Sequence, residues 1–316
     1  MCKYPFFSVI IPVYNKEKHI ERSISSALNQ SFQDFEVITV CDPSTDKSTK
    51  LVENIESEKI KIFYRTEPGP GGYAARNLGI LKSSGQWVAF LDADDEWKKD
   101  HLLKLYNKII CLNGVDLIGS GWLIKKNNEY KYDKYYCKYK NIGSHEVSLE
   151  RYLINSLHGK RPIHTSGACI KNNKKIIKNL FFVHPEVKRG GDLYAWIFLI
   201  TKFKKMYWSN HIGFIYHVDS ENMVTKSAKT TGYLMNNENL SKLQRGLNIK
   251  EKKLLKRYFN RWLRNDWKSN VHRGCENFSL RKKLFWRGDF FYSAITYVTT
   301  VWPKYILKTL GFNTSK

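Results

Sequence analysis

The chain has 316 residues, 42% of them hydrophobic and 14% aromatic, so it is long and apolar enough to bury a core and is not a disordered polypeptide. Its 53 Lys and Arg against 29 Asp and Glu give a formal net charge of +24, which indicates an anionic partner: nucleic acid, anionic lipid or a phosphorylated acceptor. Residues 1–120 carry 15 cations and 16 anions, so the whole excess lies beyond residue 120.

The six cysteines are scattered, without the close pairs of a zinc knuckle or a redox motif, and are typical of reduced thiols in the cytoplasm. The amino terminus has no apolar signal-peptide segment, and we expect none. The longest candidate for a membrane helix, residues 290–303, is uncharged over 14 residues, fewer than the roughly 20 that a transmembrane helix needs.

The first hundred residues alternate between two periodicities. Continuous apolar runs predict strands at residues 7–12, 35–40, 60–64 and 87–91, the first of them ended by Pro12. Helical spacing between these runs predicts helices at residues 20–28, 51–55 and 73–81, the first of them capped by Asn15. This alternation without hairpin signals predicts an α/β fold with a mostly parallel sheet flanked by helices.

Polar residues follow three of these predicted strands: Asn15, Asp42 and Asp92. In a parallel sheet the carboxyl ends of the strands lie at one edge, where ligands bind near a topological switch point. We therefore expect these three strand ends to open onto one crevice.

The strand at residues 87–91 leads directly into four acids: Asp92, Asp94, Asp95 and Glu96. Two carboxylates about 5 Å apart repel by roughly 3 kcal/mol at an effective dielectric of about 20, and a divalent cation relieves that repulsion. Oxygen ligands suit Mg²⁺ or Mn²⁺, which keeps open positions for diphosphate oxygens. The alternative is a surface turn before an acid-rich first turn of a helix.

Four strings, in this order and spacing, resemble the nucleotide-sugar half of family 2 glycosyltransferases with the GT-A-type fold. They are residues 8–15 (SVIIPVYN), 42–46 (DPSTD), 75–80 (ARNLGI) and 90–95 (FLDADD). The resemblance covers about residues 6–220 and is sharpest before residue 100. It implies a Rossmann-like sheet in a catalytic domain at residues 1–225, with a donor half at about 1–120 and an acceptor half at about 121–225, followed by a basic helical region at 226–316.

The resemblance also implies roles for single residues. Asp42 resembles the acid that meets the nucleobase or ribose, Arg76 the basic residue near the diphosphate, and Asp92 and Asp94 the DxD pair. Asp94 would hold the metal, with Asp95 as a substitute. The residues implied to contact the donor are Pro12, Tyr14, Asp42, Arg76, Asp92 and Ala93. From the residues alone, Arg76 could instead be a solvated helix residue and Asp42 a turn or a helix cap.

On the acceptor side, the resemblance implies that Asp192 is the catalytic base; Gly191 stands where the family usually has Glu, and an Asp here could also be a helix cap. His217 resembles a histidine that the family often places near the metal, although a structural histidine fits equally well. Two further departures, Cys41 for an acid and Pro43 for a Gly, could alter contact with the nucleobase.

Two other stretches are basic and aromatic. Residues 125–140 alternate five tyrosines with cations, which is typical of an exposed hairpin or of a surface that stacks on sugars. Residues 241–290 carry 15 cations against four acids and predict basic helices, extending to residue 310, that bind an anionic membrane surface or pack on the catalytic domain.

Together these features and the resemblance predict an inverting glycosyltransferase that uses Mn²⁺ or Mg²⁺, a nucleotide-sugar donor, expected to be UDP-linked, and a glycan or lipid-linked acceptor in surface polysaccharide or lipopolysaccharide synthesis. We expect a cytoplasmic enzyme held peripherally on the inner membrane. The rival predictions are a basic nucleic-acid-binding protein, which lacks any recognised nucleic-acid module here, and a catalytically inactive sugar-nucleotide-binding scaffold.

Overall fold

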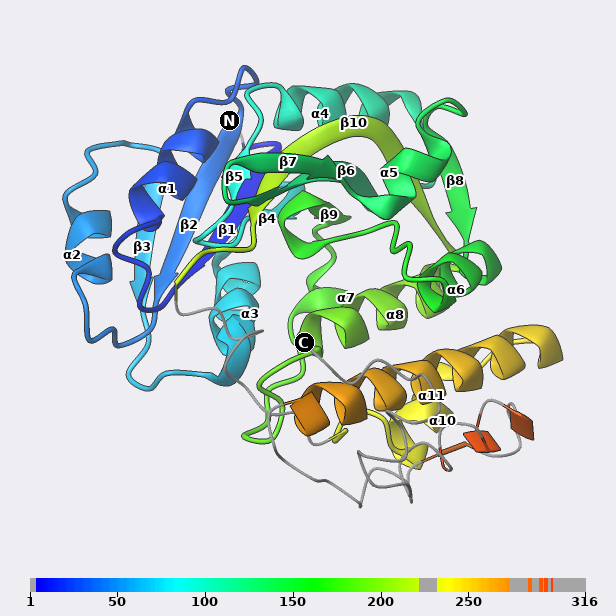
Figure 1. Cartoon of the computed structure of the whole chain (residues 1–316). Coiled ribbons are helices and arrows are strands. Elements are labelled where there is room, and N and C mark those ends of the chain that lie inside the picture. Colours follow the sequence, from blue (N-terminus) through cyan, green and yellow to red (C-terminus); the bar gives the residue numbers. More distant parts are fainter. Residues whose placement is uncertain are drawn as a thin grey trace.

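The computed structural model describes residues 4–221, 232–272, 284–285, 290–291, 293–294 and 297. Its strands form one ten-stranded sheet, and eight of them follow the order β3-β2-β1-β4-β9-β6-β10-β5. Helices cover both faces of this sheet (Figure 1). One hydrophobic cluster fills each face, the first beneath α3, α6, α8 and α11 and the second beneath α1 and α4.

The first four strands form the predicted parallel sheet. Strand β1 pairs with β2 and β4, and β2 pairs with β3, all in parallel register. The strands are β1 (Phe7–Val13), β2 (Phe35–Cys41), β3 (Ile60–Tyr64) and β4 (Trp87–Phe90). The helices between them are α1 (Ile20–Leu28), α2 (Ser48–Glu53) and α3 (Tyr73–Lys82), preceded by the 3₁₀ turn η1 (Pro70–Gly72). Strands β1 and β2 are buried on both faces, which explains their continuous apolar runs.

The second half of the sheet is mixed. Strand β9 (Ala168–Lys171) is antiparallel to both β4 and β6 (Leu117–Lys126), so β6 runs in the same direction as β4. The long β10 (Lys205–His217) is parallel to β6. The short strands β5 (Glu96–Trp97), β7 (Glu129–Tyr132) and β8 (His145–Ser148) are antiparallel additions. Because the long strands share one direction, the sheet is mostly parallel, and the predicted α/β class is confirmed.

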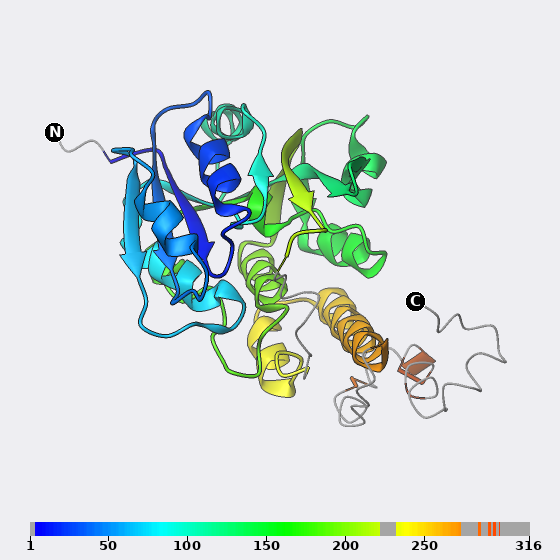
Figure 2. The same cartoon turned by 60° about the vertical axis from the view of Figure 1, so that its left-hand side comes forward.

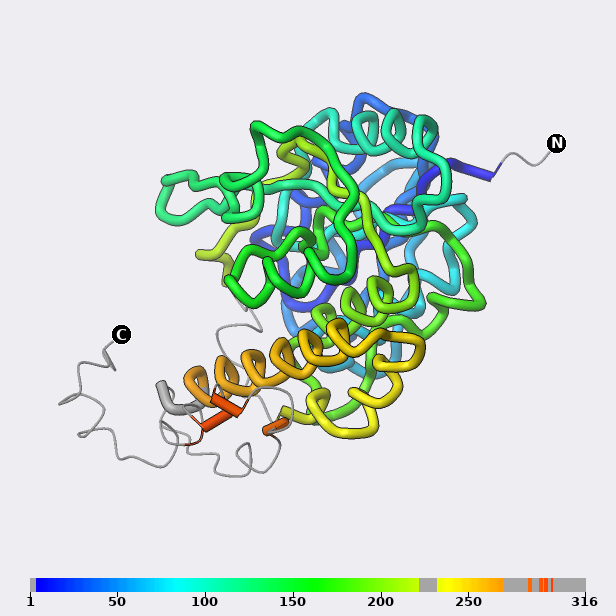
Figure 3. Tube along the Cα trace, turned by 90° about the vertical axis from the view of Figure 1, so that its right-hand side faces the viewer, coloured from blue at the N-terminus to red at the C-terminus, as the bar shows by residue number. Residues whose placement is uncertain are grey.

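The remaining helices surround this second half. They are α4 (His101–Cys111), α5 (Lys134–Tyr139), α6 (Leu149–Leu157), α7 (Lys174–Ile177), α8 (Gly191–Phe203), α10 (Asn237–Leu243) and α11 (Ile249–His272), with the 3₁₀ turn η2 (Thr165–Gly167) before β9. Helix α11, drawn in orange, lies beside α8 and α6 (Figures 2 and 3). It therefore packs directly against the body that carries the sheet.

The packing of α11 shows what its aromatic residues do. Phe259, Trp262 and Trp267 are buried against the body, whereas Lys252 and Lys253 on the same helix are exposed. In the described residues, the aromatic face of this helix is thus a packing face. The helix predicted to extend to residue 310 lies almost entirely outside the described residues. No described helix is both long and apolar enough to cross a membrane.

Two local predictions at the end of β1 were wrong. Asn15 does not cap α1: the helix begins at Ile20 after His19, while Asn15 adopts a φ of 49° and its side-chain oxygen accepts a hydrogen bond from the Thr45 N–H at 2.8 Å. Pro12 does not end β1, which continues to Val13. Asn15 instead ties the end of β1 to the turn after β2, and this holds two strand ends together.

The tyrosine-rich stretch is a hairpin followed by a helix. Lys126 and Glu129 close the β6–β7 pair. Tyr130 and Tyr132 are half exposed on the hairpin, whereas Tyr135 and Tyr139 of α5 are buried against the second half of the sheet. None of these tyrosines lines the large cavity described below. The interpretation as a hairpin whose tyrosines cover a neighbouring element is therefore favoured over a sugar-stacking surface.

A buried acid on β2 makes the stability of the fold sensitive to acid. Glu36 accepts hydrogen bonds from Ser8, Ser84 and Lys61 at 2.6 to 2.7 Å. Burial alone would raise the pKa of Glu36, but these hydrogen bonds outweigh burial and lower it from 4.5 to about 2. Since the folded-state pKa is depressed, this stabilisation is fully present above pH 4.5 and is lost as the pH falls toward 2.

We therefore expect Glu36→Gln to destabilise the protein at pH 7, by up to about 3 kcal/mol. The difference from wild type should shrink by about 1.5 kcal/mol at pH 3.5. At that pH the Glu36 carboxylate of wild type takes up a proton when the protein unfolds, and this stabilises the unfolded state. Urea unfolding at both pH values measures this. Glu146→Gln, which removes an exposed ion pair with Lys205, serves as the control and should show a difference near zero at both pH values. A Glu36→Gln difference that does not change with pH would contradict the prediction.

Candidate active site

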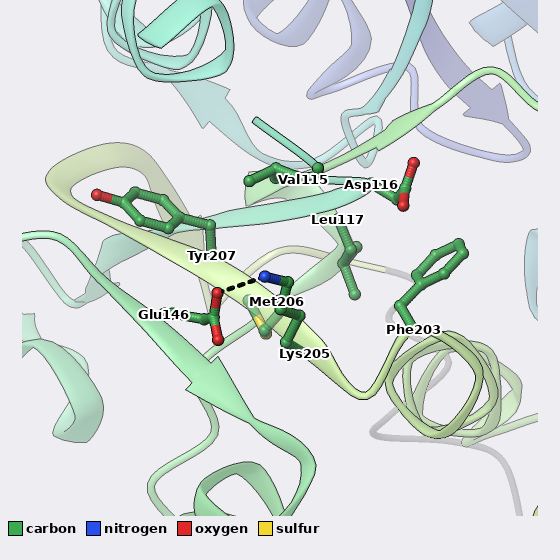
Figure 4. A pocket seen from close by; sticks show the side chains of 9 residues that line it. Val115, Asp116, Leu117, Glu146, Phe203, Lys205, Met206 and Tyr207 are labelled. Carbon is green, nitrogen blue, oxygen red and sulfur yellow. Dashed lines mark hydrogen bonds and ion pairs between the residues drawn. The ribbon is translucent and has the colours of Figure 1, made fainter. Parts of the chain in front are cut away.

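One large cavity, of about 640 Å³, lies at the carboxyl ends of the parallel strands. This volume is within the range typical of ligand sites. A second cavity, beside the Glu146–Lys205 ion pair at the start of β10, measures only about 20 Å³ and can hold little more than a water molecule (Figure 4). The large cavity is therefore the candidate active site.

The structure brings most of the predicted site residues to this cavity. Its lining includes the seven residues Pro12, Tyr14, Asp42, Arg76, Asp92, Ala93 and Asp94, and also Asp192. They come from the ends of β1, β2 and β4, from α3 and from the start of α8. The expectation that three strand ends open onto one crevice is confirmed.

Arg76 and Asp92 form a buried ion pair. The guanidinium of Arg76 donates to the Asp92 carboxylate and, at 3.0 Å, to the carbonyl of Gly71. The Arg76 side chain is 9% exposed and lies over the rings of Phe181 and Tyr73. Arg76 is thus not a solvated helix residue. Its interactions fix the guanidinium between the η1 turn and the end of β4.

This pair sets the charge state of the cavity floor. Burial alone would raise the pKa of Asp92, but the neighbouring groups, Arg76 first among them, together hold that pKa below its usual value. Burial lowers the pKa of the neighbouring His164 to about 4, so its imidazole is neutral near pH 7. A neutral imidazole can accept or donate a hydrogen bond beside the ionised Asp92 without adding charge.

Asp42 is buried, and both of its oxygens have partners. Arg65 donates to one oxygen at 2.6 Å, and the Gly69 N–H donates to the other at 3.0 Å. These bonds tie the end of β2 to the loop that precedes α3. Each carboxylate oxygen can accept a second hydrogen bond, so Asp42 retains acceptor capacity toward the cavity.

Asp94 faces the cavity together with a lysine that sequence reasoning missed. Lys16 donates to its carboxylate at 2.7 Å, and the two side chains are 12% and 15% exposed. Arg22 holds the Asp94 carbonyl at 2.6 Å. The available signal for Lys16 was its position two residues after Tyr14, at the end of β1, where a cation lies close to any anion bound at the strand ends.

Asp95 and His217 are not in the cavity lining. Asp95 is fully buried, where the Ser166 hydroxyl donates to it, and burial together with the charge of Asp94 raises its pKa well above the usual value. The His217 ring lies 3.4 Å from Glu96, and burial lowers its pKa. Both residues are buried outside the cavity lining, and their assignment as metal ligands stays a prediction.

Asp192 lies in the first turn of α8, which begins with Gly191 after Gly190. In the described part of the chain its carboxylate has no hydrogen-bond or ion-pair partner, so it does not cap the helix. The charge of Asp192 nevertheless acts on its surroundings. The pKa of Tyr73 is raised mainly by the burial of its ring and, second, by the negative charge of Asp192. A carboxylate without a protein partner in a cavity is free to accept a proton.

The structure explains why Gly occupies position 191. The Gly191 N–H donates to the Tyr73 hydroxyl at 3.0 Å, and a Cβ at Gly191 would lie 2.8 Å from the Tyr73 ring. Gly190, with a φ of 82°, is in the left-handed region, and a Cβ there would lie 2.3 Å from the Trp262 ring of α11. Both glycines therefore allow the start of α8 to fit between α3 and α11.

The opposite wall of the cavity was not predicted. It includes Arg161 from the segment after α6, Lys188 and Arg189 before α8, and five residues of α11: Tyr258, Arg261, Trp262, Asn265 and Asp266. His164 also lines the cavity, beside Asp92 at the strand ends. No motif marked the α11 residues, because their place in the site depends on how a distant helix packs. The basic character of this region was the only signal for them.

The carboxylates that line the cavity fit a divalent cation that is held partly by the protein and partly by a bound substrate. The described residues contain no group of three or more His, Cys, Asp and Glu side chains that could bind a metal ion by themselves. The Asp94 carboxylate faces the cavity and can provide one oxygen ligand. Mg²⁺ is usually bound in this way, by one or two carboxylates together with substrate phosphates.

Comparison with known proteins decides the family. The model of the family described as glycosyl transferase family 2 matches residues 8–181, more than half of the chain. The chain belongs to glycosyl transferase family 2. The match includes the strand-end residues of the cavity, whereas Asp192 and α11 lie beyond it.

Relatives and solved structures agree with this assignment. The amylovoran biosynthesis glycosyltransferase AmsB of Erwinia amylovora is 36% identical over 163 residues, which are 47% of this chain and 50% of that protein. The chain spans half or less of the length of the relatives that it matches best in sequence. The Staphylococcus aureus TarS 1–349 structure, in complex with UDP-GlcNAc, has a TM-score of 0.69 at 18% identity and covers 96% of this chain and 92% of its own.

A mannosyltransferase of Pyrobaculum calidifontis, PcManGT, solved with GDP-Man and Mn²⁺, has a TM-score of 0.53 at 17% identity. It covers 98% of this chain and 80% of its own. At these identities the two structures show the fold alone, and they confirm the GT-A-type fold of this family 2 glycosyltransferase.

Proposed function

We propose that this chain is a metal-dependent, inverting glycosyltransferase that moves a sugar from a nucleotide-sugar donor to a hydroxyl group of a glycan or lipid-linked acceptor. One observation carries the proposal: one cavity joins the Arg76–Asp92 pair and Asp94, at the strand ends, with Asp192, whose carboxylate has no partner among the described residues. Family membership adds the reaction class. The AmsB likeness supports a place in surface polysaccharide synthesis.

The mechanism assigns the donor to the strand ends. Asp42 and Asp92 accept hydrogen bonds from the nucleoside, and Tyr14, Pro12 and Ala93 provide contact surface around it. Arg76 and Lys16 lie where they can balance the negative charge that develops on the leaving diphosphate. Since Arg76 is already fixed by Gly71 and Asp92, little reorganisation is needed when that charge forms.

Asp192 acts at the other side of the donor sugar. Its carboxylate removes the proton of the acceptor hydroxyl as the oxygen attacks the anomeric carbon, and the bond to the diphosphate breaks on the opposite face. One displacement of this kind inverts the anomeric centre. The Tyr73–Gly191 hydrogen bond holds the first turn of α8 and thereby positions the carboxylate.

A divalent cation, Mn²⁺ or Mg²⁺, would be held by Asp94 and the donor diphosphate and would supply electrostatic stabilisation of the leaving group. Asp94 lines the cavity and His217 and Asp95 do not, so Asp94 is the preferred ligand. The metal present with PcManGT supports this choice of cofactor.

The donor nucleotide and the location are further parts of the proposal. A UDP-linked donor is supported by the complex of TarS with UDP-GlcNAc. Attachment to an anionic membrane surface is supported by the exposed lysines of α11 and by Phe290 and Phe291, which are 69% and 80% exposed. Lipopolysaccharide and other lipid-linked glycans would present their acceptor hydroxyls at such a surface.

The first test measures nucleoside diphosphate release from UDP-, GDP- and dTDP-sugars, with Mn²⁺ or with EDTA. We expect release from one donor that is lost in EDTA and in Asp94→Asn. The matched control is Asp34→Asn, an exposed acid away from the cavity, which should keep the wild-type rate.

The other outcomes separate the rival functions. Donor binding by calorimetry without release would indicate an inactive sugar-nucleotide-binding scaffold. Neither release nor binding of any donor, together with salt-dependent binding of DNA or RNA, would indicate the nucleic-acid-binding alternative.

A further inference from the structure

The two walls of the cavity differ in how their cations are paired. At the strand ends, Lys16 pairs with Asp94 and Arg76 pairs with Asp92. On the opposite wall, Arg161, Lys188 and Arg261 form no hydrogen bond or ion pair with any other residue that the structure describes. The positive charge of that wall is therefore left for a ligand.

The carboxylates of the second wall do not balance this charge. It carries four cations, the three unpaired ones and Arg189, whose guanidinium donates to the Ser269 hydroxyl at 3.1 Å. Only two acids, Asp192 and Asp266, line the same wall. Gathering like charges in a partly buried cavity costs free energy, and a bound anion offsets that cost.

Arg161 and Arg261 come from different elements and line the same cavity. The segment after α6 passes α11 so closely that a Cβ built at Gly159 would lie 3.5 Å from an Arg261 guanidinium nitrogen. Arg161 follows two residues later and lines the same cavity. Two guanidinium groups that a loop and a helix bring to one cavity are suited to the several oxygens of one anionic group.

The same wall holds the proposed catalytic base. The charges of Arg161 and Asp192 both act on the phenols of Tyr152 and Tyr258, whose pKa values are raised, chiefly by burial. Arg161 thus lies in the same electrostatic neighbourhood as Asp192. An anion held by Arg161 would therefore lie near the proposed base.

We propose that the acceptor carries a phosphate group close to the attacking hydroxyl, and that Arg161, Lys188 and Arg261 bind this phosphate. The proposal rests on the glycosyltransferase function proposed above and names the class of its acceptor. Phosphate is preferred to a single carboxylate because three cations without an ion-pair partner among the described residues line one cavity, and phosphate offers more acceptor oxygens to them. The donor diphosphate has its own cations, Lys16 and Arg76, at the strand ends.

The test uses glucose 6-phosphate, glucuronate and glucose as probes of the acceptor side. Binding is measured by calorimetry, in the presence of Mn²⁺ and of the nucleoside diphosphate of the donor that the release assay identifies. We expect glucose 6-phosphate to bind at least tenfold more tightly than glucose or glucuronate. The triple variant Arg161→Gln, Lys188→Gln, Arg261→Gln should lose at least tenfold of that affinity and change donor affinity less than twofold.

A control variant separates this site from the general positive charge of the chain. Lys171, Lys175 and Lys178 are exposed and lie outside the cavity, so their replacement by Gln removes the same charge elsewhere. The control should keep the affinity for glucose 6-phosphate. Thermal unfolding of both variants confirms that each is folded, and single substitutions replace the triple variant if it is not.

The source of the phosphate is resolved by a second pair of probes, glucose 1-phosphate and its decyl ester. Equal affinities indicate a phosphate within a glycan, and tighter binding of the ester indicates a lipid-linked acceptor. Equal binding of glucose and glucose 6-phosphate by wild type, or loss of donor affinity in the triple variant, would overturn the proposal. Donor release by wild type is the separate readout of the glycosyltransferase function: if release persists while the phosphate preference is absent, only the acceptor proposal fails.

Discussion

Asp192→Asn is expected to lower the rate of sugar transfer by roughly 10² to 10⁴ while leaving donor affinity nearly unchanged. The amide has the size of the carboxylate but cannot accept the proton of the acceptor hydroxyl. Because Asp192 has no protein partner among the described residues, its replacement leaves no buried group without a hydrogen bond, and stability should hardly change. Single-turnover transfer and calorimetry with the donor measure the two quantities separately.

The variant Asp192→Glu tests whether the carboxylate itself is needed and complements Asp192→Asn. It keeps the acid but moves the carboxylate by one methylene, so a partial recovery of transfer would indicate that the proton acceptor itself matters. An unchanged transfer rate in Asp192→Asn would remove this residue from the role of base. A loss of donor affinity that parallels the loss of rate would place Asp192 in donor binding instead.

The second large effect is expected at the buried ion pair. Arg76→Met leaves the Asp92 carboxylate without its main partner, and breaking a buried pair in this way costs about 3 kcal/mol or more of folding stability. Donor affinity should fall as well, since Arg76 lines the cavity. Urea unfolding measures the first loss and calorimetry with the donor the second.

The double variant Arg76→Met, Asp92→Leu distinguishes the structural role of the pair from its role in binding. Replacing both charges by apolar groups of similar size removes the unpaired carboxylate, so most of the stability should return. Donor affinity should remain low, because neither variant restores the guanidinium. Recovery of both quantities in the double variant would show that Arg76 acts only through the fold.

The donor side of the site followed from the sequence because its information is local. Strands β1, β2 and β4 are buried on both faces or nearly so, and their apolar runs mark them directly, whereas β3 at the edge of the sheet is only partly buried. Residues that follow such strands must lie at the carboxyl edge of the sheet. The positions of Asp42, Asp92 and Asp94 were therefore fixed by the order of the strands.

The remainder depends on contacts between distant segments. Strand β9 lies between β4 and β6 and is antiparallel to both, and its short apolar sequence does not indicate that direction. Asn15 was assigned to a helix cap because a polar residue before an apolar helix usually has that role, but its side chain instead holds the turn at Thr45. Gly191 was read as a missing Glu, whereas the Tyr73 ring fills the space that a side chain would need.

The division of the cavity between two walls has an evolutionary consequence. The strand-end wall lies within the stretch that the family model matches, residues 8–181, while Asp192 and α11 lie beyond it. Substitutions on the outer face of the cavity, at Arg261 or Asn265, leave the strand ends and their ion pairs untouched. The α11 part of the acceptor side can therefore vary between family members while the residues proposed to activate the donor stay the same.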